Sequence, residues 1–331
     1  MRSRRLALVG FGLLAGLTAC QGAQAAPMVP QLRNLDHDAA AGVAEPPSPR
    51  TVVMPAGDLR LLVESLLEWH GISLTWAMRT TITSDPTQAG WIDQLGVNAD
   101  ELSAAIGAVY GPIGARTFHQ QWAQHAQFLI DYAAARRRGD SDAANEARSN
   151  LAAYEHDAGR FLERATAGRV PAATAEALLH DHVERMLSQA DATLAGDRPQ
   201  ASTLVQQDHR YLTGVADALA GAFAAQVPAA FPGPIDAAST VFCSIARQAV
   251  GTYALAELDR LVGNRSPGPA PSADEVHAAL GPDGASWDPA TKLVGAWRTT
   301  ATVSPPSLAT TVKSSLADAG TFIDGLSGAK T

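Results

Sequence analysis

A stretch of 26 residues decides the fold: it begins at Ala172, reads AATAEALLHDHVERMLSQADATLAGD and ends at Asp197. Its apolar residues recur every three or four positions, and Leu178 and His182 share one stripe, which predicts an amphipathic helix. Gly196 suits the left-handed end of a helix, and Asp197 suits the cap of a returning helix. The stretch therefore predicts a helix, a tight turn and an antiparallel partner.

The same spacing between a histidine and a turn occurs at two earlier places in the chain. Fourteen residues separate the two features in each of three cases: His70 to Ser84-Asp85, His125 to Gly139-Asp140, and His182 to Gly196-Asp197. The first case departs from the others because serine replaces glycine and residues 86–90 lengthen the turn. Repeated units of this kind indicate stacked helical hairpins. We expect an all-α fold, an antiparallel bundle of about three hairpins.

Helical periodicity covers most of the chain from residue 58 onward. The six bundle segments expected are 58–81, 99–109, 116–138, 143–165, 172–195 and 201–226. Residues 56–232 thus form the predicted bundle. Residues 233–331 are predicted as a C-terminal helical extension with helices at 236–263, 273–280 and 308–326, and a Pro/Gly-rich loop between the first and last. These helices either pack on the bundle or form a separate small unit.

The first 20 residues have the pattern of a targeting segment. Three arginines precede an uncharged run that is too short to span a bilayer, and the segment ends Leu17-Thr18-Ala19-Cys20. These four residues resemble the bacterial lipobox, which implies that Cys20 is acylated and becomes the mature N-terminus. An ordinary secretory signal is the alternative, and the export route, Sec or twin-arginine, is left open. Residues 21–55 contain six prolines and are predicted to be a flexible tether.

The net charge of the chain limits the classes of partner that it can bind. The chain carries a net charge of −8, and removal of Arg2, Arg4 and Arg5 with the signal would make it −11. Nucleic-acid binding is disfavoured, because neutralising phosphates requires a basic face. We expect a protein held on the cell membrane by its lipid, facing outside the cytoplasm, with an envelope protein as one further candidate partner.

Four histidines fall on apolar helix stripes and are candidate metal ligands: His70, His125, His182 and His209. A buried neutral imidazole needs a hydrogen-bond partner or a metal ion. Fourteen residues of helix place each repeated histidine about 21 Å before its turn, so stacked hairpins would bring the three to one level. His209 is expected opposite His182 on the returning helix. Copper, zinc and iron all accept imidazole nitrogen. The alternative is that the repeated positions serve packing alone.

Acidic residues near these histidines are candidates for the surrounding shell, where a carboxylate would accept a hydrogen bond from the second ring nitrogen. They are Glu68, Asp181, Asp208 and Asp217. The other histidines of the body, among them His119 and His156, are expected near the surface.

The chain also resembles a poorly characterised bacterial family of all-helical proteins. The resemblance lies in Glu68-Trp69-His70, Gln124-His125, Asp181-His182, the Gly-Asp turns, and His209 followed by Ala216-Asp217 and Gln226-Val227-Pro228. It covers about residues 58–232 and implies the bundle and the histidine positions without implying an activity. Gln124 and Asp181 stand where that family has glutamate, which weakens a carboxylate role at those two positions.

The sequence contains none of the catalytic motifs that would identify an enzyme class, such as a nucleophile elbow, a Walker loop, H-E-x-x-H or C-x-x-C. Two functions remain after this exclusion. We favour a lipoprotein that binds a transition metal or small ligand through the histidine cluster. The alternative is a structural or protein-interaction envelope lipoprotein without metal or catalysis, and an oxidase or hydrolase lacks any supporting motif.

Overall fold

The computed structural model describes residues 53–262 and 272–328, and every regular element in these two ranges is helical. Cys20 and the predicted signal and tether up to residue 52 lie outside the described residues. The long helices are α1 (Ala56–Thr83), α2 (Gln88–Arg138), α3 (Ser141–Ala165), α4 (Ala172–Ala195), α5 (Arg198–Gln226), α6 (Ala238–Leu261) and α9 (Leu308–Gly328). Shorter elements join the last two: α7 (Asp274–Leu280), α8 (Gly295–Val303), two 3-10 turns (Pro282–Gly284 and Pro305–Ser307) and a π-helical turn (Ala290–Val294). The predicted all-α bundle is confirmed.

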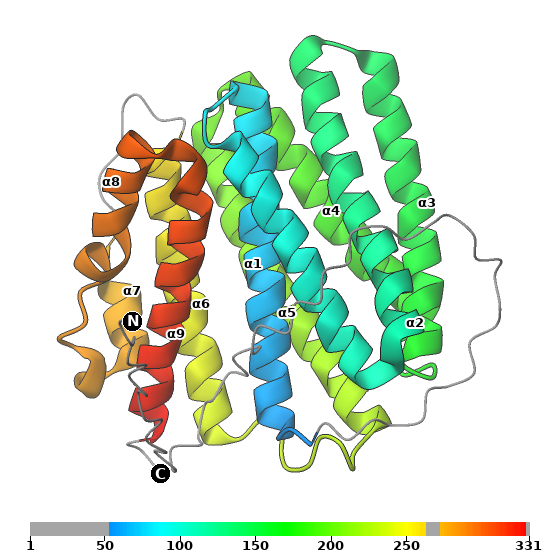
Figure 1. Cartoon of the computed structure of the whole chain (residues 1–331), viewed down its shortest axis with the longest axis vertical. Helices are drawn as coiled ribbons and strands as arrows, with labels where there is room; N and C mark the ends of the chain where they lie inside the picture. The colour runs from blue at the N-terminus through cyan, green and yellow to red at the C-terminus, as the bar shows by residue number, and fades with distance from the viewer. Residues whose placement is uncertain (1–52, 263–271, 329–331) are drawn as a thin grey trace, which may run out of the picture.

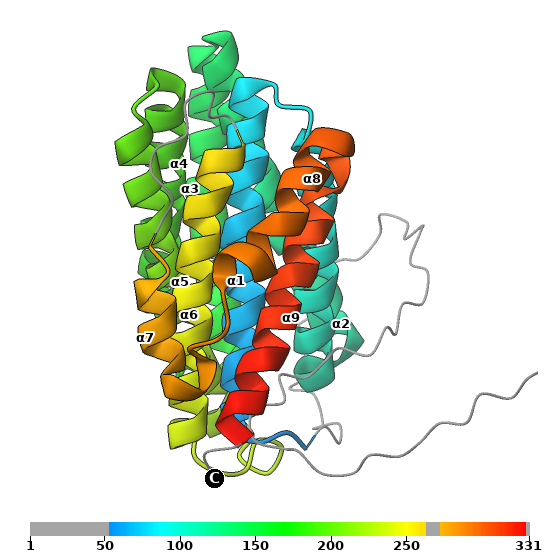
Figure 2. The same ribbon diagram turned by 90° about the vertical axis from the view of Figure 1, so that its left-hand side faces the viewer.

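Helix α1 is the centre of the arrangement (Figure 1). It packs against α2, α4 and α5 on one side and against α6 on the other. Figure 2 shows α6 and α9 running alongside α1, and α9 also contacts α6 and α2. The C-terminal helices therefore pack on the bundle, which is one of the two arrangements that the sequence allowed.

At all three predicted turns the helix ends in the left-handed region, which glycine favours and which serine adopts only rarely. Ser84, Gly139 and Gly196 end α1, α2 and α4 in the left-handed region, at φ of 56°, 70° and 73°. Asp140 and Asp197 cap the helices that follow, each accepting a hydrogen bond from a backbone N–H three residues on. The Gly-Asp pairs thus stop one helix and start the next.

Helix α2 contains two of the predicted segments, which are two helices that meet at Gly111 as the sequence predicted, and it differs from the prediction in where the first of them begins. It starts at Gln88 instead of residue 99, and at Gly111 the backbone leaves the helical region, with φ 74° and ψ −179°. Pro112 then begins the second half, where its missing N–H costs nothing because a first-turn N–H has no partner inside a helix. The early start coincides with Gly90, where a Cβ atom would collide with the backbone oxygen of Pro306.

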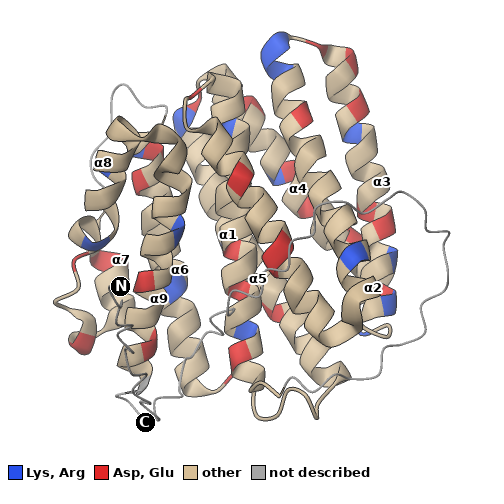
Figure 3. Cartoon of the chain, viewed as in Figure 1, with Lys and Arg blue, Asp and Glu red and all other residues tan. Residues whose placement is uncertain are grey.

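One apolar core joins the bundle to the C-terminal helices. Its fully buried side chains include Leu74 on α1, Leu129 on α2, Leu258 on α6 and Val312 on α9. A second cluster lies near the start of α1 and the end of α5 and includes Leu59 and Phe223. Charged residues of both signs are interspersed along the described helices, without a broad basic face in the view of Figure 3. No helix of the described part is both long and apolar enough to cross a membrane.

Candidate metal centre

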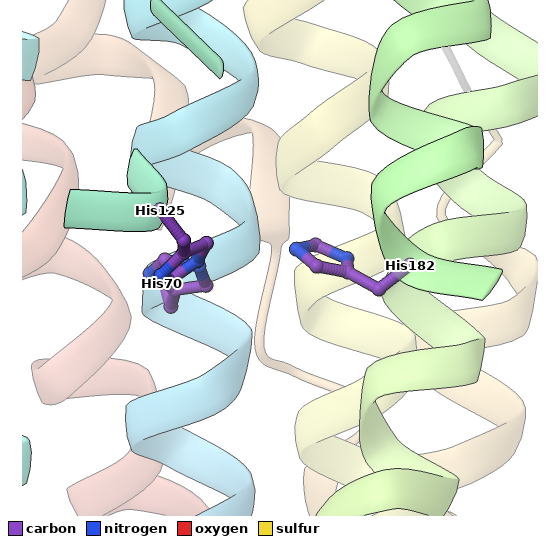
Figure 4. Close-up of side chains that lie close together, drawn as sticks. All are labelled: His70, His125 and His182. Atoms are coloured by element: carbon purple, nitrogen blue, oxygen red, sulfur yellow. The ribbon is translucent and has the colours of Figure 1, made fainter. Parts of the chain in front are cut away.

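Three of the four predicted histidines meet inside the bundle. His70 comes from α1, His125 from the second half of α2 and His182 from α4 (Figure 4). Each offers one ring nitrogen, and these three atoms all lie within 4.8 Å of one another. The side chains are almost inaccessible, with exposed fractions of 1%, 2% and 5%. We call these residues the histidine triad.

The closest pair in the triad is His70 and His125, whose Nε2 atoms are 3.1 Å apart. Two nitrogens bound to one tetrahedral ion at 2.0–2.1 Å would be about 3.3 Å apart, so the pair is already near ligand spacing. The same distance also fits an N–H···N hydrogen bond between neutral rings. The hydrogen bond requires the lone pair of one Nε2 to face the N–H of the other ring, whereas a shared ion requires both lone pairs to face the ion.

His182 is oriented by a buried carboxylate. Its Nδ1–H donates to Asp208 Oδ1 at 2.9 Å, and Asp208 on α5 is only 2% exposed. This bond fixes the proton on Nδ1 and leaves the lone pair on Nε2, an atom that is buried without a protein hydrogen-bond partner. A carboxylate behind a histidine in this way is the arrangement found around metal-ligating histidines.

Burial favours the neutral form of His70 and His125. Burial is the largest cause of a pKa well below the ordinary value for His70, and the neighbouring rings of His125 and His182 add to it. For His125, burial followed by the proximity of His182 lowers the pKa to about 3. Neutral imidazoles are the form that binds a metal ion, so these two rings are in the ligand state at neutral pH.

Aromatic rings enclose one side of the triad. Trp122 lies 4.5 Å from the His70 ring and 4.6 Å from the His125 ring, centroid to centroid. Tyr154 on α3 stacks on His125 at 4.8 Å with an interplanar angle of 13°. The sequence places Tyr154 three residues after Leu151 on the apolar stripe of its helix, but only the packing of α3 on α2 shows that it covers a histidine.

His209 is not part of the group that the structure brings together. Its Nε2 lies 3.3 Å from the backbone oxygen of Gln248 and 3.9 Å from Glu68 Oε1, and burial lowers its pKa to about 4. The preceding residue, Asp208, faces His182 in its place. One residue corresponds to a rotation of about 100° around a helix, so the expected register on α5 was off by one position.

The four predicted acidic neighbours have different surroundings. Asp208 contacts the triad as expected, whereas Asp181 is exposed and Asp217 accepts two hydrogen bonds from Arg60. Glu68 lies beside His209, and burial raises its pKa to about 8. As expected, His119 and His156 are surface residues, with side chains 44% and 57% exposed.

An apolar cavity of about 140 Å³ adjoins the triad. It lies among α1 to α5, and Trp122 and Tyr154 form part of its wall, between the cavity and the histidine rings. At roughly 24 cal/mol per Å³, a cavity of this size in a tightly packed core costs about 3 kcal/mol of stability. That is a large share of the usual 5–15 kcal/mol.

Comparison of the chain with protein-family models, curated proteins and solved structures gives no match.

Proposed function

We propose that this protein binds a transition metal ion, copper, zinc or iron, through His70, His125 and His182. The observation that supports the proposal most strongly is the convergence of three buried imidazoles from three helices, one of them oriented by Asp208. Burying three rings for packing alone does not require their nitrogens to face one another. Three histidine ligands would leave the fourth position of a tetrahedral ion for water or a small ligand.

We further propose that the protein works outside the cytoplasm, anchored to the cell membrane by acylated Cys20. The arginines, the short apolar run and Leu17-Thr18-Ala19-Cys20 support this part of the proposal. Two or more acyl chains provide a stable anchor. Mass spectrometry of the membrane-extracted protein tests it, since the mature chain should begin at a lipid-modified Cys20. A Cys20→Ser variant should lose the modification and leave the membrane fraction.

Metal uptake by the full chain is the decisive experiment. Protein stripped with a chelator and then equilibrated with Zn²⁺ or Cu²⁺ should retain about one equivalent after desalting. His125→Ala combined with His182→Ala should abolish retention, because one remaining imidazole does not make a site. The matched control is His119→Ala with His156→Ala, which removes two exposed histidines and should leave retention unchanged.

The same experiment separates the proposal from a purely structural or protein-interaction role. Under that alternative, the unaltered protein retains no ion, or the triad variant retains as much as the control. Elemental analysis of protein from its native membrane, without added metal, then identifies the ion.

A further inference from the structure

The cavity beside the triad has a lining that selects one kind of occupant. The 27 residues that line it include no charged side chain, and most are Leu, Val, Ala, Ile or Phe. Of the few polar groups, the hydroxyl of Tyr110 is already committed, since it donates to Gln226 Oε1 at 2.6 Å. A water molecule in a cavity needs two to four polar partners, and a charged ligand needs an opposite charge. The other polar side chains of the lining are Gln121, Trp122 and Tyr154, and almost all of the surface that faces the cavity is apolar, so the wall favours an apolar occupant over water or a charged ligand.

The side chains that line the cavity leave the space between these helices unfilled. Large apolar side chains that point among the helices, such as Leu66, Phe118, Leu179 and Leu219, are only half-buried because the space between them is not filled. Met54 and Phe231 line the same cavity, so it lies at the end where the chain enters α1. Apolar cavities of this kind stay dry and take up apolar molecules.

We propose that this cavity is a binding site for the end of an alkyl chain, either of a free long-chain compound or of a membrane lipid. The inference goes beyond metal binding and does not require the ion. A chain lying among α1 to α5 would contact the faces of Trp122 and Tyr154 that are turned away from the triad. Its affinity comes from apolar burial, so it should rise with chain length until the cavity is full and then level off.

The test uses the full chain with Cys20→Ser, stripped of metal with a chelator, and a series of n-alkanols from butanol to dodecanol measured by isothermal titration calorimetry. Affinity should rise about three- to fourfold per methylene and then reach a plateau. Ala158→Phe, which fills the cavity from α3, should weaken decanol binding at least tenfold. Ala153→Phe makes the same change at an exposed position of α3 and should leave binding unchanged.

A second filling variant, Val215→Phe on α5, keeps the test valid if Ala158→Phe does not fold, as judged by circular dichroism. Absence of binding to the unaltered cavity overturns the proposal, and so does equal binding by the folded filling variants and Ala153→Phe. Lipid mass spectrometry of the protein extracted from membranes distinguishes the sources: a co-purifying phospholipid identifies a membrane acyl chain, and a co-purifying single-chain compound identifies a free ligand.

Discussion

The bond between His182 and Asp208 determines which nitrogen of His182 faces the other two rings. Replacing the carboxylate with a carboxamide keeps an acceptor for Nδ1–H but removes the buried negative charge that balances a bound cation. We expect Asp208→Asn to weaken metal binding by about 10- to 100-fold. A competition titration with a chromophoric chelator measures this, and Asp181→Asn, on the exposed side of α4, should change little. If the two variants bound the metal ion with equal affinity, Asp208 would have no role in metal binding.

Glu64 predicts a pH dependence of stability that does not involve the triad. Burial raises its pKa to about 7, with Asp217 adding to the rise, while hydrogen bonds from Arg60 and Ser244 oppose it; Glu68 lies one turn further along α1. The folded protein therefore keeps a proton that the unfolded chain loses near pH 4.5. This contribution to stability is complete below that pH and is lost as the pH rises towards 7.

Glu64→Gln isolates this contribution, because its side chain carries no charge at any pH. The free energy of unfolding of the unaltered protein, minus that of the variant, should fall between pH 4.5 and 7 by at most about 1.4 kcal/mol per pH unit. Urea titrations across this range measure it. A difference that stays level or rises with pH would contradict the prediction.

For individual residues, the sequence predicted the histidine triad better than it predicted the residues that contact the triad. The fourteen-residue spacing placed His70, His125 and His182 at one level, because rise per residue is nearly constant in a helix. It could not decide between Asp208 and His209, since the rotation of α5 depends on how it packs against α1 and α4. Nor could it show that Trp122 and Tyr154 cover the rings, because side-chain packing between helices has no short-range signature.

Among the elements, α2 contains the least usual backbone. Gly111 has φ 74° and ψ −179°, a region that is accessible essentially to glycine alone. We expect Gly111→Ala to cost about 1–3 kcal/mol, measured by urea unfolding. Gly96→Ala is the matched control on the same helix, at an exposed position with open space around it, and should stabilise by about 0.5–1 kcal/mol. Similar effects at both positions would show that the backbone at Gly111 does not require glycine.

The helix ends show why some elements were predictable. Gly139-Asp140 and Gly196-Asp197 have local chemistry that stops one helix and starts another, and the structure confirms both turns. The start of α2 at Gln88 was not expected, since Gly90 lowers helix propensity there. Contact with Pro306, more than 200 residues away in sequence, overrides that local preference.

On the scale of the whole molecule, the shared core predicts one cooperative unfolding transition. Leu74, Leu129, Leu258 and Val312 belong to a single cluster, so α6 and α9 should not unfold separately from the bundle. Thermal melts followed by circular dichroism and by tryptophan emission should coincide. If the triad binds Zn²⁺ only in the folded state, the ion at 100 times its Kd adds about 2.7 kcal/mol and raises both midpoints together, and a chelator reverses this. Two separate midpoints would contradict the shared core.

The position of Trp122 has an optical consequence. Its indole lies against both His70 and His125, closer to the triad than the other tryptophans whose ring contacts are described. An open-shell ion such as Cu²⁺ held by those rings would quench its fluorescence at short range, whereas filled-shell Zn²⁺ has no electronic states that accept the excitation. The protein therefore contains an intrinsic emitter whose brightness distinguishes the two ions without any added dye.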